Sequence, residues 1–210
     1  MKRVIFYFDG FNFYNGLKEI ASYDPHWKNY YWLDFTSFCQ KFIPGSELVA
    51  IKYFTAPPNN NGQRSRQSAL FSANKILSGS KFYVINGNYQ DKKIECKKCK
   101  RDFFHPEEKR TDVNIATHML LDCFKDRADT LVLVSADSDQ VPTIASIKSN
   151  FTNKSVKVYF PPNRSSAEIM TVIRPIVFLE KNEDKFRDSL MPDKVVCGDK
   201  EYTIPPGWKI

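Results

Sequence analysis

Four aspartates occupy positions from which they can build a metal site. Asp9 ends an apolar run near the start of the chain, Asp137 and Asp139 follow a second apolar run, and Asp112 begins the amphipathic stretch before that second run. In an open α/β sheet the carboxyl ends of the strands form the ligand crevice, so acids placed there converge on one point. Crowded carboxylates repel one another, and a hard divalent cation with oxygen ligands relieves the repulsion. The pattern therefore predicts a Mg²⁺ or Mn²⁺ site.

Each candidate ligand also has a purely structural explanation. An aspartate at a strand end, such as Asp9, can simply form a turn, and Asp112 can interact favourably with the dipole of its helix. Asn12, three residues after Asp9, can hydrogen-bond a ligand at the start of the first helix or can cap that helix. A structural explanation that covers both Asp9 and residues 137–139 requires two coincidences at strand ends. We therefore favour the interpretation as a functional site.

Apolar runs alternate with amphipathic stretches along most of the chain. The apolar runs predict strands at residues 4–8, 48–54, 81–85, 131–134, 156–160 and 176–179. The helical spacing of apolar residues predicts helices near residues 13–20, 35–43, 64–77, 111–124 and 142–147. Strands and helices that alternate in this order form a parallel sheet with right-handed connections. The expected fold class is α/β, with a central, mainly parallel sheet flanked by helices.

Two segments depart from this alternation. Residues 87–108 are polar, rich in lysine and flanked by short alternating segments, which predicts a small cysteine-containing hairpin insertion. Residues 181–193 are charged, and residues 204–208 have no regular period, which predicts an extended tail at the end of the chain. We expect one domain over residues 1–180, with the insertion at about 87–108, and a C-terminal extension over residues 181–210 that packs on it.

The composition limits the class of protein. The hydrophobic content of 42% and the aromatic content of 14% exclude general disorder, and no apolar run approaches the roughly 20 residues that cross a bilayer. The first apolar run is short and ends in Asp9, which indicates a buried strand and not a secretory signal, so we expect a cytoplasmic protein with no membrane partner. The net charge of +7 suits a polyanionic partner, although a charge that only maintains solubility explains it equally well.

The insertion contains part of a second possible metal site. Cys96 and Cys99 with His105 have the spacing of half a zinc site, but a structural zinc takes four ligands. The fourth ligand can come from His26, from Cys197 or from a second chain in a homodimer. A metal-free pair of reduced cysteines is an equally good explanation. The odd number of five cysteines argues against a disulfide framework.

Three blocks of the sequence together resemble the NYN domain family of PIN-like nucleases, and the resemblance is greatest to its bacterial LabA-type branch. The blocks read FDGFN at residues 8–12, EKRTDVNIA at residues 108–116 and LVSADSDQVP at residues 133–142. The resemblance implies a Rossmann-like PIN/NYN fold and a metal-dependent ribonuclease. The family's acidic positions match Asp9, Asp112, Asp137 and Asp139, and its characteristic asparagine matches Asn12.

The chain departs from the family pattern at two positions. Ala136 stands where the family usually has glycine, and Gln140 stands where it usually has an aromatic residue. Alanine is a small change that leaves the acids in place, whereas Gln140 alters the packing or the substrate stacking next to Asp139.

The expected reaction is hydrolysis of RNA phosphodiester bonds by water that one or two divalent ions activate. Five cations are candidates for the capture of substrate phosphates, or else are solvated surface charges: Arg64, Arg66, Lys109, Arg110 and Arg164. Four aromatic residues can stack on the bases of single-stranded RNA, or else belong to the core: Tyr14, Tyr30, Tyr31 and Trp32.

Two other functions fit parts of the pattern. An RNA- or partner-binding module with weak or no nuclease activity is the main alternative, because metal ligands alone do not establish catalysis. A haloacid-dehalogenase-type phosphatase also begins with an acid-tipped strand. That chemistry requires a second aspartate two residues after the first, where this chain has Phe11, so we exclude it.

Overall fold

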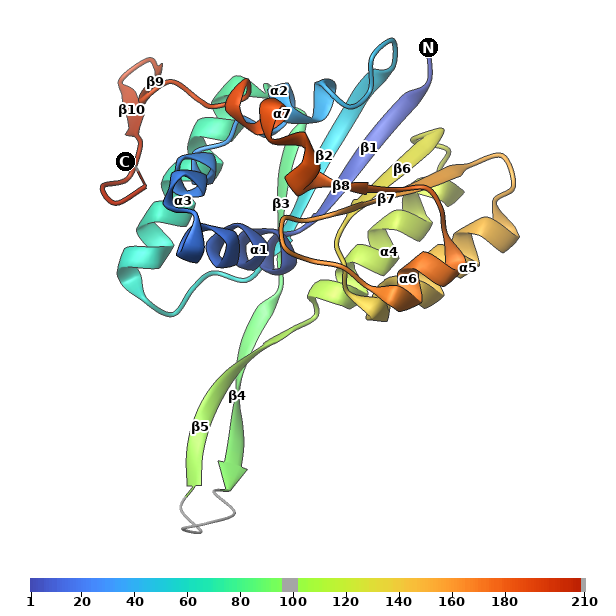
Figure 1. Ribbon diagram of the computed structural model, residues 1–210, viewed down its shortest axis with the longest axis horizontal. Helices are drawn as coiled ribbons and strands as arrows, with labels where there is room; N and C mark the ends of the chain where they lie inside the picture. Colours follow the sequence, from blue (N-terminus) through green and yellow to red (C-terminus); the bar gives the residue numbers. More distant parts are fainter. Residues whose placement is uncertain (96–101, 209–210) are drawn as a thin grey trace.

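The centre of the structure is a six-stranded sheet in which all neighbouring strands run parallel (Figure 1). The computed structural model describes residues 1–95 and 102–208. Across the sheet the strands are β3 (Phe82–Asn86), β2 (Glu47–Thr55), β1 (Arg3–Asp9), β6 (Thr130–Val134), β7 (Ser155–Phe160) and β8 (Ile176–Phe178). The chain adds strands first on one side of β1 and then on the other. This reversal between β1 and β6 is the switch point at which open α/β sheets bind ligands.

Helices cover both faces of this sheet, because β1 is apolar on both sides. Phe6 and Phe8 point into a core that includes residues of α1 (Gly10–Tyr23), α2 (Phe35–Gln40) and α3 (Asn61–Leu77). Ile5 and Tyr7 point into a second core with α4 (Thr111–Phe124), α5 (Val141–Asn150) and α6 (Ala167–Val172) (Figure 1). Strands of parallel sheets that are buried on both faces are continuously apolar, as β1 and β6 are. The predicted α/β fold class is therefore confirmed.

Polar side chains fix where several of these helices begin. Four helices follow a residue whose side chain accepts a backbone N–H of the first turn: α1 follows Asp9, α2 follows Asp34, α3 follows Asn60 and α6 follows Ser166. These residue types satisfy N–H groups that the helix itself leaves unpaired. Asp9 is therefore a helix cap as well as a strand end. The capping role considered for Asn12 belongs to Asp9 instead, because the backbone N–H of Asn12 is the donor of this bond.

The predicted insertion is a two-stranded antiparallel hairpin of β4 (Asn88–Glu95) and β5 (Asp102–Lys109). It extends away from the carboxyl edge of the sheet (Figure 1). Cys96 and Cys99, two of the predicted zinc ligands, lie outside the described residues. His105 belongs to β5, and its side chain lies outside the described part of the chain as well.

The C-terminal segment packs on the face of the sheet that carries α1 to α3. It contains η3 (Leu179–Asn182), α7 (Glu183–Arg187) and a hairpin of β9 (Lys194–Cys197) and β10 (Lys200–Thr203). As predicted, residues 204–208 form no helix or strand, and Trp208 packs on the domain with 6% of its surface exposed. The sequence pattern did not predict the elements before this tail, which are the helix with the fully buried Phe186 and the paired strands at residues 194–203.

Among residues 1–95 and 102–208, no helix combines the length and the apolar character that a membrane crossing requires.

Candidate metal centre

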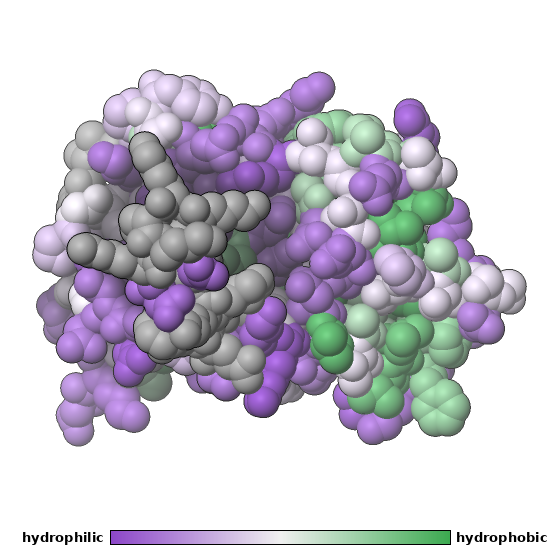
Figure 2. Space-filling view, turned by 90° about the horizontal axis from the view of Figure 1, so that it is seen from below, coloured by the Kyte–Doolittle hydropathy of each residue, from purple (hydrophilic) through white to green (hydrophobic). Residues whose placement is uncertain are grey.

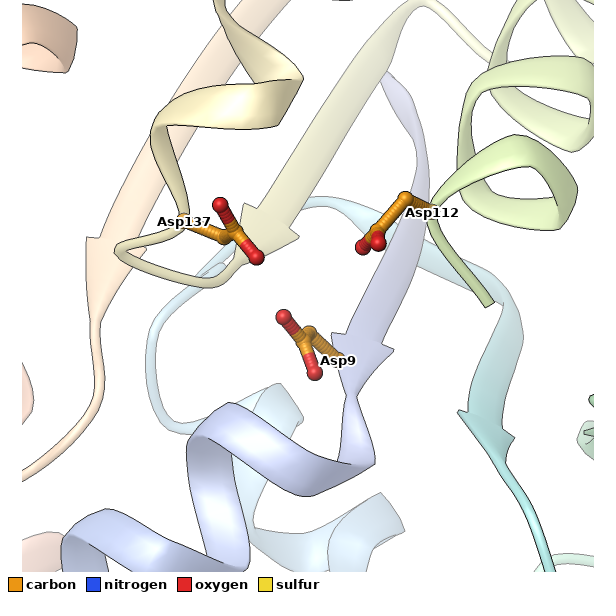
Figure 3. A group of neighbouring side chains, drawn as sticks. All are labelled: Asp9, Asp112 and Asp137. Carbon is orange, nitrogen blue, oxygen red and sulfur yellow. The ribbon is translucent and has the colours of Figure 1, made fainter. Parts of the chain in front are cut away.

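Three of the four predicted aspartates converge at the carboxyl edge of the sheet (Figure 3). Asp9 ends β1, Asp137 follows the neighbouring strand β6, and Asp112 lies in the first turn of α4. One carboxylate oxygen from each lies within 4.8 Å of the other two. The group sits at the point where the strand order reverses, because β1 and β6 are the strands on either side of the reversal.

Asp9 is the most buried member of the group, with 4% of its surface exposed. Its Oδ1 accepts the backbone N–H of Asn12 at 3.0 Å, and its Oδ2 accepts the hydroxyl of Ser135 at 2.8 Å. Burial raises the pKa of Asp9 to about 6, the two hydrogen bonds oppose this shift, and the charges of Asp112 and Asp137 add to it. A nearby positive charge would therefore stabilise the ionised form of Asp9.

The loops after β1 and β6 are joined by hydrogen bonds around this carboxylate. The side-chain oxygen of Asn12 accepts the N–H of Ala136 at 3.0 Å, and the Ser135 Oγ accepts the N–H of Asp137 at 3.0 Å. Asn12 thus binds the opposite loop and also faces the cavity at the site. Because each loop is held by the other, the positions of Asp9 and Asp137 are fixed before any ligand binds.

Asp112 contacts a buried glutamine. Gln140, which is 1% exposed, directs its Nε2 toward the Oδ1 of Asp112 at 3.4 Å and toward its backbone oxygen at 3.5 Å. Burial raises the pKa of Asp112, and the negative charges of Asp137 and Asp139 raise it further. Gln140, noted in the sequence as a departure from the family pattern, is therefore a neighbour of the site.

Asp139 does not join the three-oxygen group, although we predicted it as a fourth ligand. It lies in the short helix η2 (Ser138–Gln140), is exposed, and donates its backbone N–H to the Oδ1 of Asp137 at 3.0 Å. Its charge still acts on the site, because it raises the pKa of Asp112.

The three carboxylates line a cavity of about 280 Å³. The other lining residues are Phe11, Asn12, Asn15, Thr111 and Arg164. Arg164 is the cation in this lining, and its guanidinium pairs with Glu19 at 2.9 Å. Ser135 and Asn15 were not singled out from the sequence. The position of Ser135 two residues before Asp137 at the end of a strand was the available signal for it.

The other predicted substrate residues do not line this cavity. Arg64, at the start of α3, donates its Nε to the carbonyl of Pro58 at 3.1 Å, and Arg66 lines a neighbouring hollow. Lys109 and Arg110 are exposed just before α4, where Arg110 has a left-handed φ of 77°. The structure therefore places these cations around the site and not in it.

The donor set of the cavity fits a hard divalent cation. Oxygen ligands on opposite sides of such an ion, each at about 2.0–2.6 Å, lie roughly 4–5 Å apart, which agrees with the 4.8 Å limit on the separations among the three aspartates. The two histidines with described side chains have partners elsewhere. His26 contacts the carboxylates of Asp24 and Glu183, and His118 contacts Lys52.

Comparisons with known proteins agree with the geometry of the fold. The model of the NYN domain family matches residues 3–180. The chain is 25% identical to the 6-hydroxy-3-succinoylpyridine 3-monooxygenase HspA of Pseudomonas putida, over 98% of this chain and 75% of that protein. The crystal structure of a protein of unknown function from Vibrio parahaemolyticus is similar, with a TM-score of 0.57 and 21% identity over 84% of this chain and 91% of that one.

Proposed function

The chain belongs to the NYN domain family of PIN-like nucleases, and from this premise we propose that it is a Mg²⁺- or Mn²⁺-dependent ribonuclease. The observation that carries the proposal is the convergence of Asp9, Asp112 and Asp137 within 4.8 Å at the switch point of the sheet. Three crowded carboxylates, one of them almost completely buried, are stabilised when a cation neutralises them.

Each residue of the site has a distinct part in the proposed reaction. Asp9, Asp112 and Asp137 would hold the cation, and the charge of the nearby Asp139 would add to the attraction for it. When bound, a divalent cation lowers the pKa of water and stabilises negative charge on a phosphodiester. Ser135 keeps Asp9 and the Asp137 loop in place through its two hydrogen bonds.

The charge of the protein supports a nucleic-acid substrate. The net charge is +7 despite the acidic cavity, so cations dominate the rest of the surface. Such a surface attracts the phosphate backbone, while the acidic centre accepts it only after a metal has neutralised the carboxylates. Figure 2, which views the molecule from below, shows mainly hydrophilic residues around a hollow near the middle of this face.

The name of the Pseudomonas relative describes a different reaction, the monooxygenation of 6-hydroxy-3-succinoylpyridine. The donor set favours hydrolysis, because carboxylate oxygens suit hard cations such as Mg²⁺ and Mn²⁺. Iron oxygenases of the common facial-triad type use two histidines with one carboxylate, and neither His26 nor His118 belongs to the group of three aspartates.

The proposal is tested by incubating the wild-type protein with labelled single-stranded RNA or DNA, in Mn²⁺ or in EDTA. We expect RNA cleavage in Mn²⁺, none in EDTA, and a loss of roughly 100-fold or more in Asp137→Asn. Asp188→Asn, an exposed aspartate outside the cavity, is the matched control and should cleave like the wild type. Equal activity of the wild type and Asp137→Asn would remove the catalytic assignment, and binding of RNA without cleavage would favour the binding-module alternative.

A further inference from the structure

Two further hollows continue from the acidic cavity along α1. The first, of about 220 Å³, shares Phe11 and Asn15 with the acidic cavity and extends between α1 and α3. The second, of about 460 Å³, shares four residues with the first: Tyr14, Lys18, Arg66 and Trp208. Because consecutive hollows share lining residues, they form one groove, which we call the α1 groove and which leads away from the three aspartates.

The sign of the charge reverses between the acidic cavity and the α1 groove. The groove is lined by Lys18, Lys28 and Arg66, and no carboxylate among the described residues lines it. None of these three cations forms an ion pair with a carboxylate in residues 1–95 or 102–208. Unpaired cations that line a groove are suited to phosphate groups, which would replace the missing counter-charges.

An aromatic cluster of Tyr14, Tyr31 and Trp208 stands beside these cations. Tyr14 is 37% exposed, and its ring packs on that of Tyr31 at a centroid distance of 5.5 Å. Tyr31 in turn packs on Trp208 at 5.5 Å. Trp208 belongs to the C-terminal segment, beyond the residues that match the family model, and that segment lies beside α3 (Figure 1). The tilted contact with Tyr31 holds one side of the Tyr14 ring, so the exposed remainder of the ring has a fixed orientation.

We propose that the α1 groove binds the single-stranded part of an RNA substrate next to the bond that is cut. Lys18, Lys28 and Arg66 contact phosphates, and Tyr14 stacks on a base. Stacking of this kind requires unpaired bases, so a single strand fits the groove and a duplex does not. This inference rests on the proposed function for the place of cleavage, whereas binding in the groove is independent of the metal.

The experiment measures binding under conditions that prevent cleavage. Fluorescence anisotropy of a labelled single-stranded RNA oligonucleotide is recorded in EDTA with the wild type and with Lys18→Glu, Arg66→Glu and Tyr14→Ala. The control is Lys75→Glu, an exposed lysine nine residues after Arg66 on α3 that does not line the groove. All variants are first compared with the wild type by thermal melting, and the conservative Lys18→Gln and Arg66→Gln replace any variant that has lost its fold.

The expected result separates the groove variants from the control. Lys18→Glu and Arg66→Glu should each weaken binding by roughly 10-fold. Each should also reduce, by about 1, the magnitude of the negative slope of the logarithm of the association constant against the logarithm of the salt concentration. Tyr14→Ala should weaken binding by roughly 10-fold with little change in that slope. Lys75→Glu should bind within about 2-fold of the wild type, and a duplex RNA of the same length should bind more weakly than the single strand.

The outcomes distinguish this inference from the proposed function. The groove proposal would be refuted by groove variants that bind RNA like Lys75→Glu, or by a duplex that binds as tightly as the single strand. Mn²⁺-dependent cleavage by the same variants at the wild-type rate would still support the nuclease proposal. Conversely, loss of binding in the groove variants supports the groove even if the wild type never cleaves RNA. A wild-type protein that binds no single-stranded RNA would refute the inference.

Discussion

Asp9 combines a structural role with an electrostatic cost. It caps α1 and joins the loops after β1 and β6, yet it is 4% exposed and faces two other carboxylates. Its folded-state pKa of about 6 lies above the ordinary value of 3.8. For an acid, a raised pKa means that the folded state binds the proton more tightly than the unfolded state. The contribution of Asp9 to the free energy of unfolding therefore decreases as the pH rises from about 4 through 6 and does not change further above that range.

Replacement of Asp9 by asparagine should remove this cost. An amide oxygen can still accept the N–H of Asn12, but no charge is buried, so in EDTA at pH 8 we expect Asp9→Asn to be more stable than the wild type by on the order of 1–3 kcal/mol. The difference should vanish near pH 3.5, where both side chains are neutral. Thermal melts over this pH range measure it. In Mn²⁺ the order should reverse, because the wild type binds the ion and the variant loses a ligand.

Asp139→Asn is the control for this prediction, because Asp139 is exposed and lies outside the three-oxygen group. Its melting temperature in EDTA should stay close to that of the wild type. An Asp9→Asn protein that melts below the wild type in EDTA at pH 8 would show that the cap and the loop contact of the carboxylate outweigh the cost of burying its charge.

The rule of acids at strand ends was sufficient to find Asp9 and Asp137, because a parallel sheet aligns the ends of its strands. It did not place Asp139. The direction of that side chain depends on the single turn of η2, whose geometry is set by the hydrogen bond from Asp139 to Asp137. Ser135 lay inside the recognised block, but its double hydrogen bond becomes visible only when β1 and β6 are known to be neighbours.

At the scale of elements, the alternation of apolar and amphipathic segments predicted the strands of the sheet, since long buried runs leave few alternatives. The order of the strands did not follow from this pattern, because parallel strands with right-handed crossovers can be arranged on either side of the first one. The C-terminal elements were missed for a different reason. The helix α7 has five residues, and its one buried member, Phe186, shows no periodicity by itself. The residues that Phe186 contacts are far away in the sequence. One of them is Phe38, whose ring centroid lies 4.5 Å from that of Phe186.

A histidine connects the end of α1 to the C-terminal elements. His26 in η1 (Pro25–Tyr31) places its Nδ1 2.5 Å from Asp24 and its Nε2 2.7 Å from Glu183, and Tyr30 also donates to Glu183. The bond to Glu183 raises the pKa of His26 most, and Asp24 raises it further. A raised histidine pKa contributes stability that is fully present below the unfolded pKa of about 6.5 and is lost as the pH rises through the folded value.

This linkage predicts a pH-dependent effect of His26→Gln. The variant should melt well below the wild type at pH 5.5, where the imidazolium pairs with both carboxylates, and close to the wild type at pH 9. His118→Gln is a control of opposite sign, because burial and the nearby Lys52 lower the pKa of His118. That variant should gain stability relative to the wild type as the pH falls. If the melting temperatures of His26→Gln and the wild type differ by the same amount at pH 5.5 and at pH 9, the ionic role of the His26 ring is contradicted.

At the scale of the whole molecule, the match to the family model ends at residue 180, whereas the core continues to Trp208. Phe186 has no exposed surface and contacts the rings of Phe13, Trp27, Tyr30 and Phe38. Hydrogen bonds to the backbone also connect the C-terminal segment to the rest of the domain. Asp34 donates its N–H to Ser189, and the indole of Trp32 donates to the carbonyl of Pro192 at 2.9 Å.

These contacts predict that a chain shortened to residues 1–180 does not fold on its own. Without the C-terminal segment, the aromatic core on the face of α1 to α3 would be exposed to water, and the N–H of Asp34 and the indole of Trp32 would lose their partners. We expect the shortened chain to show no cooperative urea transition and to bind a hydrophobic dye. A cooperative transition at the midpoint of the full chain would mean instead that the segment is a dispensable addition.

A point variant separates the role of the segment from the general effect of truncation. Phe186→Ala in the full chain should lower the free energy of unfolding by about 3–5 kcal/mol, since a large aromatic side chain leaves a cavity in a closely packed core. Leu190→Ala is the matched control, because Leu190 lies in the same segment but is 40% exposed, and it should cost less than about 1 kcal/mol. Urea unfolding curves with unchanged slopes measure both values. If both variants cost the same small amount, then Phe186 does not connect the segment to the core, and the stability of the domain resides in residues 3–180 as the family model delimits them.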